Sequence, residues 1–220
     1  MSRRMRIPLL LTLLALAAPA LAATPHTVTE IVFDSALWQR VREPATFHYR
    51  YRLDGPTLPA PHFEKARMEV REVRPDGEKL VYFDLFEGPN HRAFGPVPAR
   101  DVNPMILVFL QKDVAGMHNL TGGAQGYFQQ QIRRAFNRPA EVERIRIRFD
   151  GREIGATRVR IRPFARDPNI ARFPQFRDKS YEFTVSDAIP GGLYRILIRT
   201  PDPEGRTVIE ESLTFERLSP

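Results

Sequence analysis

Most of the chain alternates between apolar and polar residues with the period of two that is typical of half-buried β-strands. The segment TFHYRYRLD shows it most clearly, since Phe47, Tyr49 and Tyr51 lie on one side and histidine and arginines on the other. The alternation returns in FEKARMEVREV, EVERIRIRFDG and ATRVRIRPF. The segments SYEFTVSD, LYRILIRT and RTVIEESLTFERL, separated by the turn signals IPGG and PDPEG, predict a final three-stranded meander.

Several segments need a more specific prediction. KLVYFDLFEG is apolar on both sides and predicts a central strand covered on both faces. TVTEIVFD alternates loosely and reads as strand-like, whereas SALWQRV favours one helical turn capped by Asp34 or Ser35. RDPNIARFPQFRD is predicted to be a loop.

Asp150-Gly151 predicts a two-residue hairpin turn. Such a turn pairs Ile147 with Ile154 but places Val159 on the wrong face. We therefore predict a β-bulge near Gly155 that restores the register.

Residues 103 to 137 follow a helical pattern instead. Asn103 followed by Pro104 is a strong helix start, and the residues from Met105 to Leu110 are all apolar, which predicts burial on nearly every side. A second, amphipathic helix carries Phe128, Ile132 and Phe136 at i, i+4 and i+8. The order of elements predicts an α+β fold: a single antiparallel, curved, half-barrel-like β-sheet with two inserted helices packed on one face. The helices either form a lid over a concave sheet or simply cover it.

The chain opens with three arginines, an apolar run from Ile7 to about Ala18, and small residues up to Ala22. This order predicts a secretory signal peptide over residues 1–22. The alternative is a transmembrane anchor, but the run is shorter than the roughly 20 residues that a spanning helix needs. Residues 23–220 are then predicted to form a single periplasmic β-rich domain with a helical insertion at about 103–137.

The composition narrows the classes of function. The chain has no cysteine, which excludes disulfides, thiolate metal sites and a lipid-attachment cysteine. Arginine greatly outnumbers lysine, which suggests a GC-rich bacterial genome and, with the signal peptide, a Gram-negative periplasm. Three of the seven net positive charges lie in the predicted signal peptide, so the remaining chain carries +4. This modest charge does not predict a nucleic-acid partner, although attraction to an anionic membrane surface remains an open alternative.

Catalytic and metal-binding motifs are missing from the sequence. No serine lies in a G-x-S-x-G motif, and no two of the five histidines have the spacing of metal ligands on one strand or helix. We therefore predict neither a catalytic residue, a metal nor a cofactor. His91 in the loop GPNHRAFG is the most interesting single residue, although a solvated loop histidine is the simpler interpretation. The run from Gly122 to Gly126 matches no phosphate-binding spacing.

Arginines recur at alternate positions in two adjacent predicted strands: residues 144, 146 and 148, and residues 158, 160 and 162. They would form one cationic hairpin face that meets phosphates of a lipid surface, or a solvated face neutralised by glutamates such as Glu210 and Glu211. We favour the second interpretation.

The absence of cysteine, the signal peptide, the antiparallel sheet and the helical insertion together resemble the periplasmic lipoprotein-carrier (Lol-type) architecture. In that fold, helices close an incomplete barrel over an apolar cavity. The segments NPMILVFLQKDV, GGAQGYFQQQIRRAF and DAIPGGLYRI are also similar to a family of uncharacterised secreted proteobacterial β-rich proteins. Neither resemblance carries over a functional residue.

These observations favour a non-enzymatic periplasmic binding or carrier protein for a lipid or acylated ligand. The alternatives are a cell-envelope module that binds another protein without a small ligand and, least favoured, an enzyme of unrecognised type. The oligomeric state is not predicted. The residues expected to line the ligand cavity are Phe47, Tyr49, Tyr51, Tyr82, Leu107, Leu110, Phe128 and Ile132.

Overall fold

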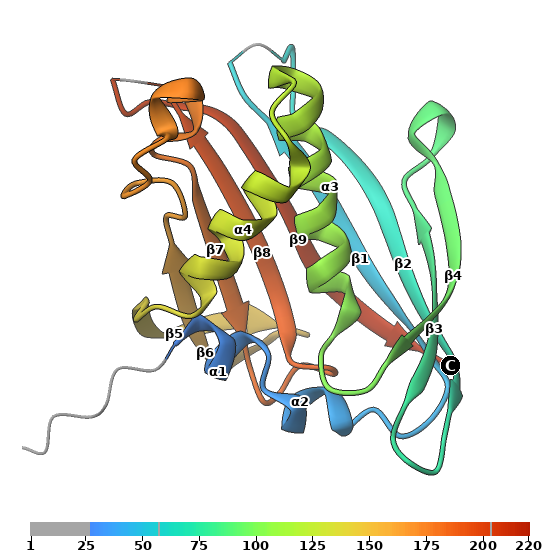
Figure 1. The fold of residues 1–220 in the computed structure, drawn as a ribbon. Helices are drawn as coiled ribbons and strands as arrows, with labels where there is room; N and C mark the ends of the chain where they lie inside the picture. The colour runs from blue at the N-terminus through green and yellow to red at the C-terminus, as the bar shows by residue number, and fades with distance from the viewer. Residues whose placement is uncertain (1–26, 57, 203) are drawn as a thin grey trace, which may run out of the picture.

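A computed structural model describes residues 27–56, 58–202 and 204–220. The predicted signal peptide lies outside the described residues. Nine antiparallel strands form one sheet in the order β4-β3-β2-β1-β9-β8-β7-β6-β5 (Figure 1). The strands are β1 (Ala45–Asp54), β2 (His62–Val73), β3 (Lys79–Leu85), β4 (Arg92–Ala99), β5 (Glu141–Phe149), β6 (Arg152–Ile161), β7 (Ser180–Val185), β8 (Leu193–Pro201) and β9 (Thr207–Ser219).

Two long helices cross one face of this curved sheet (Figure 1). They are α3 (Pro104–Thr121) and α4 (Gln125–Phe136), and the short helices α1 (Val28–Val32) and α2 (Ser35–Gln39) lie beside them near one end of the sheet. Three-residue 3₁₀ turns cover Gly88–Asn90, Ile170–Arg172 and Pro174–Phe176. The predicted α+β class, with one curved sheet and two helices on one face, is confirmed.

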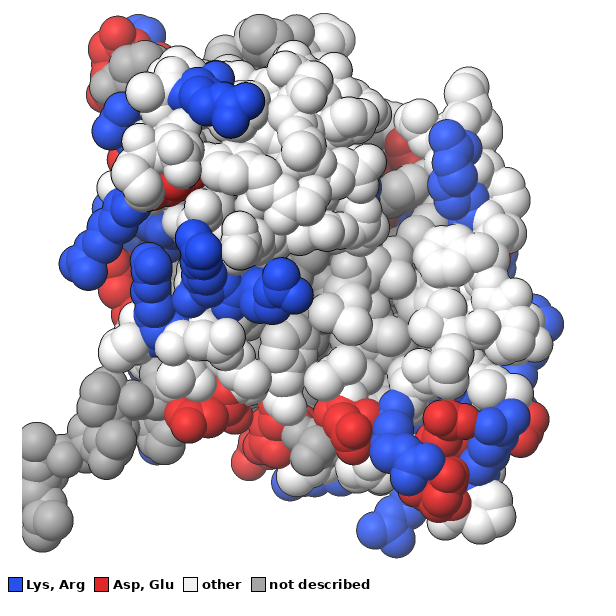
Figure 2. All heavy atoms as spheres, in the orientation of Figure 1, with Lys and Arg blue, Asp and Glu red and all other residues white. Residues whose placement is uncertain are grey.

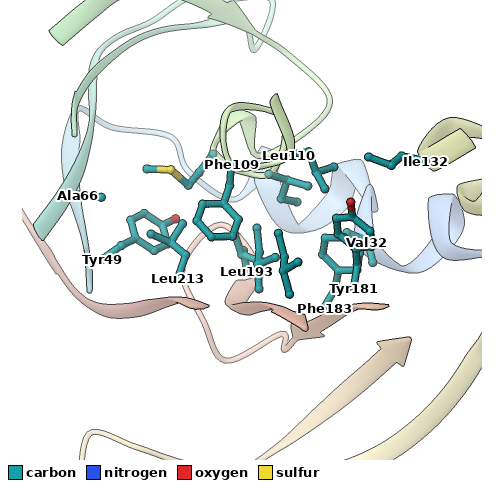
Figure 3. Close-up of a cluster of buried hydrophobic side chains, with 14 of the residues drawn as sticks. Val32, Tyr49, Ala66, Phe109, Leu110, Ile132, Tyr181, Phe183, Leu193 and Leu213 are labelled. Atoms are coloured by element: carbon teal, nitrogen blue, oxygen red, sulfur yellow. The ribbon is translucent and has the colours of Figure 1, made fainter. Parts of the chain in front are cut away.

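The core lies between α3, α4 and the covered face of the sheet. Figure 3 shows Phe109 and Leu110 of α3 pointing toward Leu193 and Leu213 of the sheet. The alternation in β1 makes the covered face of this strand apolar. Phe47, Tyr49 and Tyr51 are at most 4 % exposed, whereas Arg50 between them is exposed.

Helix α3 begins where the sequence predicts. The Asn103 side chain accepts a hydrogen bond from the Met105 backbone N–H at 3.1 Å, and Pro104 takes the first helical position. The helix ends at Thr121 and is capped by Gly122, whose φ of +68° is the left-handed conformation that glycine adopts without steric cost. The glycine run that follows therefore separates the two helices.

The loosely alternating segment near the start is helical, so its prediction as a strand is wrong. The Thr27 side chain accepts from the Glu30 backbone N–H at 3.3 Å, and the Glu30 carboxylate accepts from the Thr27 N–H at 2.8 Å. This reciprocal capping box starts α1. Asp34 caps α2, as one of the two predicted alternatives.

Two predictions about strands are also wrong. Strand β3 is not covered on both faces: Val81, Phe83 and Leu85 are buried, but the alternate residues are only half-buried because no layer covers the outer face there. No bulge occurs near Gly155, since β5 and β6 pair without a register shift from Ile147↔Ile154 onward. Strand β6 pairs with β7 only over Thr157–Ile161. The part of the β5–β6 hairpin beyond this pairing can therefore bury the opposite face.

The first half of α3 is not buried on every side. Met105, Ile106, Phe109 and Leu110 form the buried stripe, but Leu107 is 49 % exposed and Val108 is half-buried. The helix therefore carries more apolar surface than the sheet covers.

Candidate functional site

A groove of about 790 Å³ runs between α3 and the part of the sheet formed by β1 to β4. Figure 2 shows that the surface over α3 is largely free of charged residues and is hollowed toward β3 and β4. The surplus apolar residues of α3, Leu107 and Val108, form one wall. The opposite apolar residues are Tyr51, Leu53, Leu85, Phe86 and Phe94, and polar residues at the groove are His62, Glu64, Asn90, Arg92, Gln111, Lys112 and Asn119.

Lys112 brings a cation into this groove. Its Nζ donates to Glu211 Oε2 at 2.6 Å and to the Tyr51 hydroxyl at 3.2 Å, and Tyr51 in turn donates to Glu211 at 3.1 Å. The ammonium group lies 4.8 Å from the centre of the Tyr51 ring. Burial, and then the negative charge of Glu211, raises the pKa of Tyr51 well above its ordinary value, so Tyr51 remains a hydrogen-bond donor.

The next residue along the helix makes a second polar cluster with reversed charge. Asp113 accepts from Lys179 Nζ at 2.7 Å and from the Tyr181 hydroxyl at 2.6 Å, and both charged side chains are 5 % exposed. Lys179 also donates to Thr200 Oγ1 at 3.2 Å. Because Lys112 contacts β1 and β9 while Asp113 contacts β7, the two clusters hold α3 at a defined position across the sheet.

A smaller groove of about 380 Å³ lies between α3, α4 and α1. Leu110, Val114, Ile132, Phe136 and Phe33 make it mainly apolar, with Arg133 and several uncharged polar residues around them. Gln111 donates to Gln125 at 3.0 Å and accepts from Gln129 at 2.8 Å, which ties the two helices together. Leu107 and Gln111 line both grooves and therefore form the ridge between them.

The structure divides the residues that the sequence singled out. Tyr51 and Leu107 line the larger groove, and Leu107, Leu110 and Ile132 line the smaller one. Phe47, Tyr49 and Phe128 are at most 1 % exposed and belong to the packed core. Tyr82 lies on the outer face of β3, where the Arg71 guanidinium stacks 3.9 Å from its ring centre.

Sequence reasoning missed Lys112, Glu211, Phe86 and Phe94. Lys112 and Asp113 were visible as the first charges after an apolar helical run, but their partners lie 61 or more residues away along the chain. Only the fold brings these groups together.

The side chain of His91 contacts the carboxylate of Asp84. Its Nε2 lies 2.8 Å from Asp84 Oδ1, and Arg67 pairs with the other oxygen of Asp84. These two neighbours, Arg67 first, hold the pKa of Asp84 below its ordinary value. Within residues 27–56, 58–202 and 204–220, no group of three or more metal-ligating side chains comes together. In the same part of the chain, no helix is both long and apolar enough to cross a membrane.

The two arginine rows do not form one cationic face. Arg144 lies opposite Thr157, whereas Arg158 lies opposite Glu143, so the rows point to opposite sides of the hairpin. Glu143 pairs with Arg158 at 3.0 Å, and Glu182 pairs with Arg160 at 2.7 Å. The predicted neutralisation by glutamates therefore holds for Arg158, for Arg160 and for Arg146, which pairs with Glu153 at 3.2 Å, with partners other than Glu210 and Glu211.

No family model matches the sequence, and no curated protein is detectably similar to it. Among solved structures, the chain is similar to a LolA superfamily protein from Nitrosomonas europaea (11% identity, TM-score 0.30, 88% of this chain and 93% of that chain covered). It is also similar to the lipoprotein LppX from Mycobacterium tuberculosis (10% identity, TM-score 0.36, 87% and 93% covered). A third is an outer membrane lipoprotein-sorting protein domain from Vibrio parahaemolyticus (8% identity, TM-score 0.24, 84% and 89% covered). At these identities and TM-scores, none of the three assigns a ligand or a site residue to this chain.

Proposed function

We propose that this protein is a non-enzymatic carrier of a lipid or acylated ligand in the periplasm, and that the groove between α3 and strands β1 to β4 holds the acyl chain. The supporting observation is the apolar surface of α3 that the sheet leaves uncovered, with Leu107 and Val108 facing a groove of about 790 Å³. This volume falls in the range of about 300–1,000 Å³ that is usual for ligand sites. Each buried CH₂ group of a chain contributes about 0.8 kcal/mol.

The polar end of the ligand is expected beside Lys112. An ammonium group has three N–H donors. Lys112 donates one to Glu211 and one to Tyr51. The remaining donor is available to an ester carbonyl or a carboxylate. Since Glu211 already neutralises the cation, a neutral ester fits this position as well as an anion does.

Gly116 allows a direct test, because it lines the groove and a Cβ added there meets no other atom within 4 Å. Gly116→Trp should place an indole in the groove and weaken binding of a fluorescent long-chain fatty acid. Displacing only two CH₂ groups costs about 1.6 kcal/mol, which corresponds to a loss of roughly tenfold or more. The affinity is measured by fluorescence titration. Native mass spectrometry of the purified protein should likewise show acyl species on the wild type and fewer on the variant.

Gly126→Trp is the matched control. Gly126 is also an exposed helical glycine with open space around it, but it lines neither groove. This variant should bind the fatty acid as the wild type does. Gly116→Ala should bind normally and raise the free energy of unfolding by about 0.5–1 kcal/mol, because alanine is the better helix former. Equal binding by Gly116→Trp and wild type, or no binding by the wild type, would remove the support for this groove as a carrier site.

A further inference from the structure

We propose that the outer face of α3 and α4 docks on an anionic phospholipid bilayer, with the arginines at the end of α4 on the lipid phosphates. This inference rests on the proposed carrier function, since it supplies the surface across which the ligand would be exchanged. The surface is defined by Arg133, Arg134 and Arg138, together with Leu107.

The three arginines are exposed and lie within six residues of one another, in the last turn of α4 and just after it. Among the described residues, none of them forms an ion pair. Elsewhere on the molecule arginines are commonly neutralised, as Arg158 and Arg160 are by Glu143 and Glu182. Figure 2 shows basic side chains gathered beside the uncharged surface of the two helices. Three exposed arginines without an ion pair in the described part of the chain therefore lie close together at this end of α4.

The apolar part of the surface adjoins the arginines. Arg133 and Leu107 line the same smaller groove, and Leu107 is 49 % exposed on the ridge between the two grooves. A bilayer surface offers phosphates to the guanidinium groups and an apolar interior to a leucine at the same time. A purely polar anion would leave the exposed leucine unused, and an apolar protein partner would leave the arginines unpaired.

Docking in this orientation would turn the mouths of both grooves toward the membrane. The backbone around the arginines is held in place, because Thr29 Oγ1 donates to the Phe136 carbonyl at 3.1 Å and Thr27 bridges to Pro139. Helix α3 is fixed to the sheet through Lys112 and Asp113. The charged and apolar parts of the surface are thus presented by a rigid pair of helices.

The test is flotation of the mature protein with vesicles of phosphatidylglycerol and phosphatidylcholine in equal amounts, and with vesicles of phosphatidylcholine alone. Wild type should float with the anionic vesicles at low salt and much less at high salt, because screening weakens the contact. Arg133→Glu/Arg134→Glu/Arg138→Glu should bind the anionic vesicles roughly a hundredfold more weakly, since each basic residue near an anionic surface contributes about fivefold.

Arg42→Glu/Arg152→Glu/Arg217→Glu is the matched control. It makes the same change in net charge at three exposed arginines that form no ion pair among the described residues. This control should float as wild type does. If it loses binding equally, if the α4 variant retains binding, or if wild type binds both kinds of vesicle alike, the docking surface is overturned. Should the glutamate variant not fold, the corresponding glutamine variant provides the same comparison.

The Gly116→Trp variant separates this inference from the proposed function. It should lose fatty-acid binding but still float with anionic vesicles, since Gly116 is outside the arginine surface. Normal fatty-acid binding by a wild type that does not float would overturn the docking surface alone. Flotation by a wild type that binds no fatty acid would contradict the carrier function and leave the docking surface in place.

Discussion

Asp113→Ala is expected to lower the free energy of unfolding by about 3–5 kcal/mol, because it leaves the Lys179 ammonium buried without its counter-charge. Lys179 is 4 % exposed as a residue, and the threonine hydroxyl that remains to it cannot replace a carboxylate. The Tyr181 hydroxyl would lose its acceptor in the same step. Urea unfolding followed by circular dichroism measures the change.

Two further variants show whether the pair itself causes the loss. Asp113→Leu/Lys179→Met removes both charges and keeps similar volumes, so it should recover much of the stability that Asp113→Ala loses. Tyr181→Phe leaves the ion pair intact and should cost less than the single charge removal. If Asp113→Ala unfolded at the same urea concentration as wild type, the cluster would not anchor α3.

Phe128→Ala is expected to destabilise the fold by about 3–5 kcal/mol, the usual effect of emptying a fully buried aromatic site. Phe128 is 0 % exposed, and its ring centre lies 5.1 Å from that of Phe173 and 5.8 Å from that of Phe176. These two residues belong to the segment after β6, so the cavity would loosen both α4 and that segment. Thermal unfolding by calorimetry measures the effect.

Leu120→Ala is the appropriate comparison for Phe128→Ala, because Leu120 is a helical apolar residue that is 69 % exposed. It should change the stability by less than about 0.5 kcal/mol. A similar loss in both variants would show that α4 is held by something other than the aromatic cluster.

The segment RDPNIARFPQFRD, which packs on Phe128, shows where a local sequence pattern is no longer informative. The sequence predicts RDPNIARFPQFRD as a loop, and the structure has two 3₁₀ turns there. Ile170, Phe173 and Phe176 of this segment are nevertheless buried, and the rings of Phe173 and Phe176 pack on Phe128 of α4. Their spacing has neither the period of a strand nor that of a long helix, so periodicity alone could not place them in the core.

The candidate site was predictable only in part, for a related reason. Tyr51, Leu107, Leu110 and Ile132 were expected to line a cavity because they are apolar and lie on the sheet or the helices, and all four line one of the two grooves. The same criterion also selected Phe47, Tyr49 and Phe128, which are core residues. An apolar residue facing a neighbouring layer and one facing a groove look alike in the sequence.

Three features could be predicted from the sequence because they depend on contacts within a few residues: the strand alternation, the start of α3 at Asn103, and the two helices between groups of strands. The run of apolar residues in α3 also indicates more apolar surface than one covered face requires. What meets that surface depends on the fold. The register of nine strands places β2 to β4 at a distance from Leu107 and Val108 that leaves a groove, and it brings Glu211 to Lys112 and Lys179 to Asp113. Such pairings join residues far apart in the chain, so no local pattern encodes them.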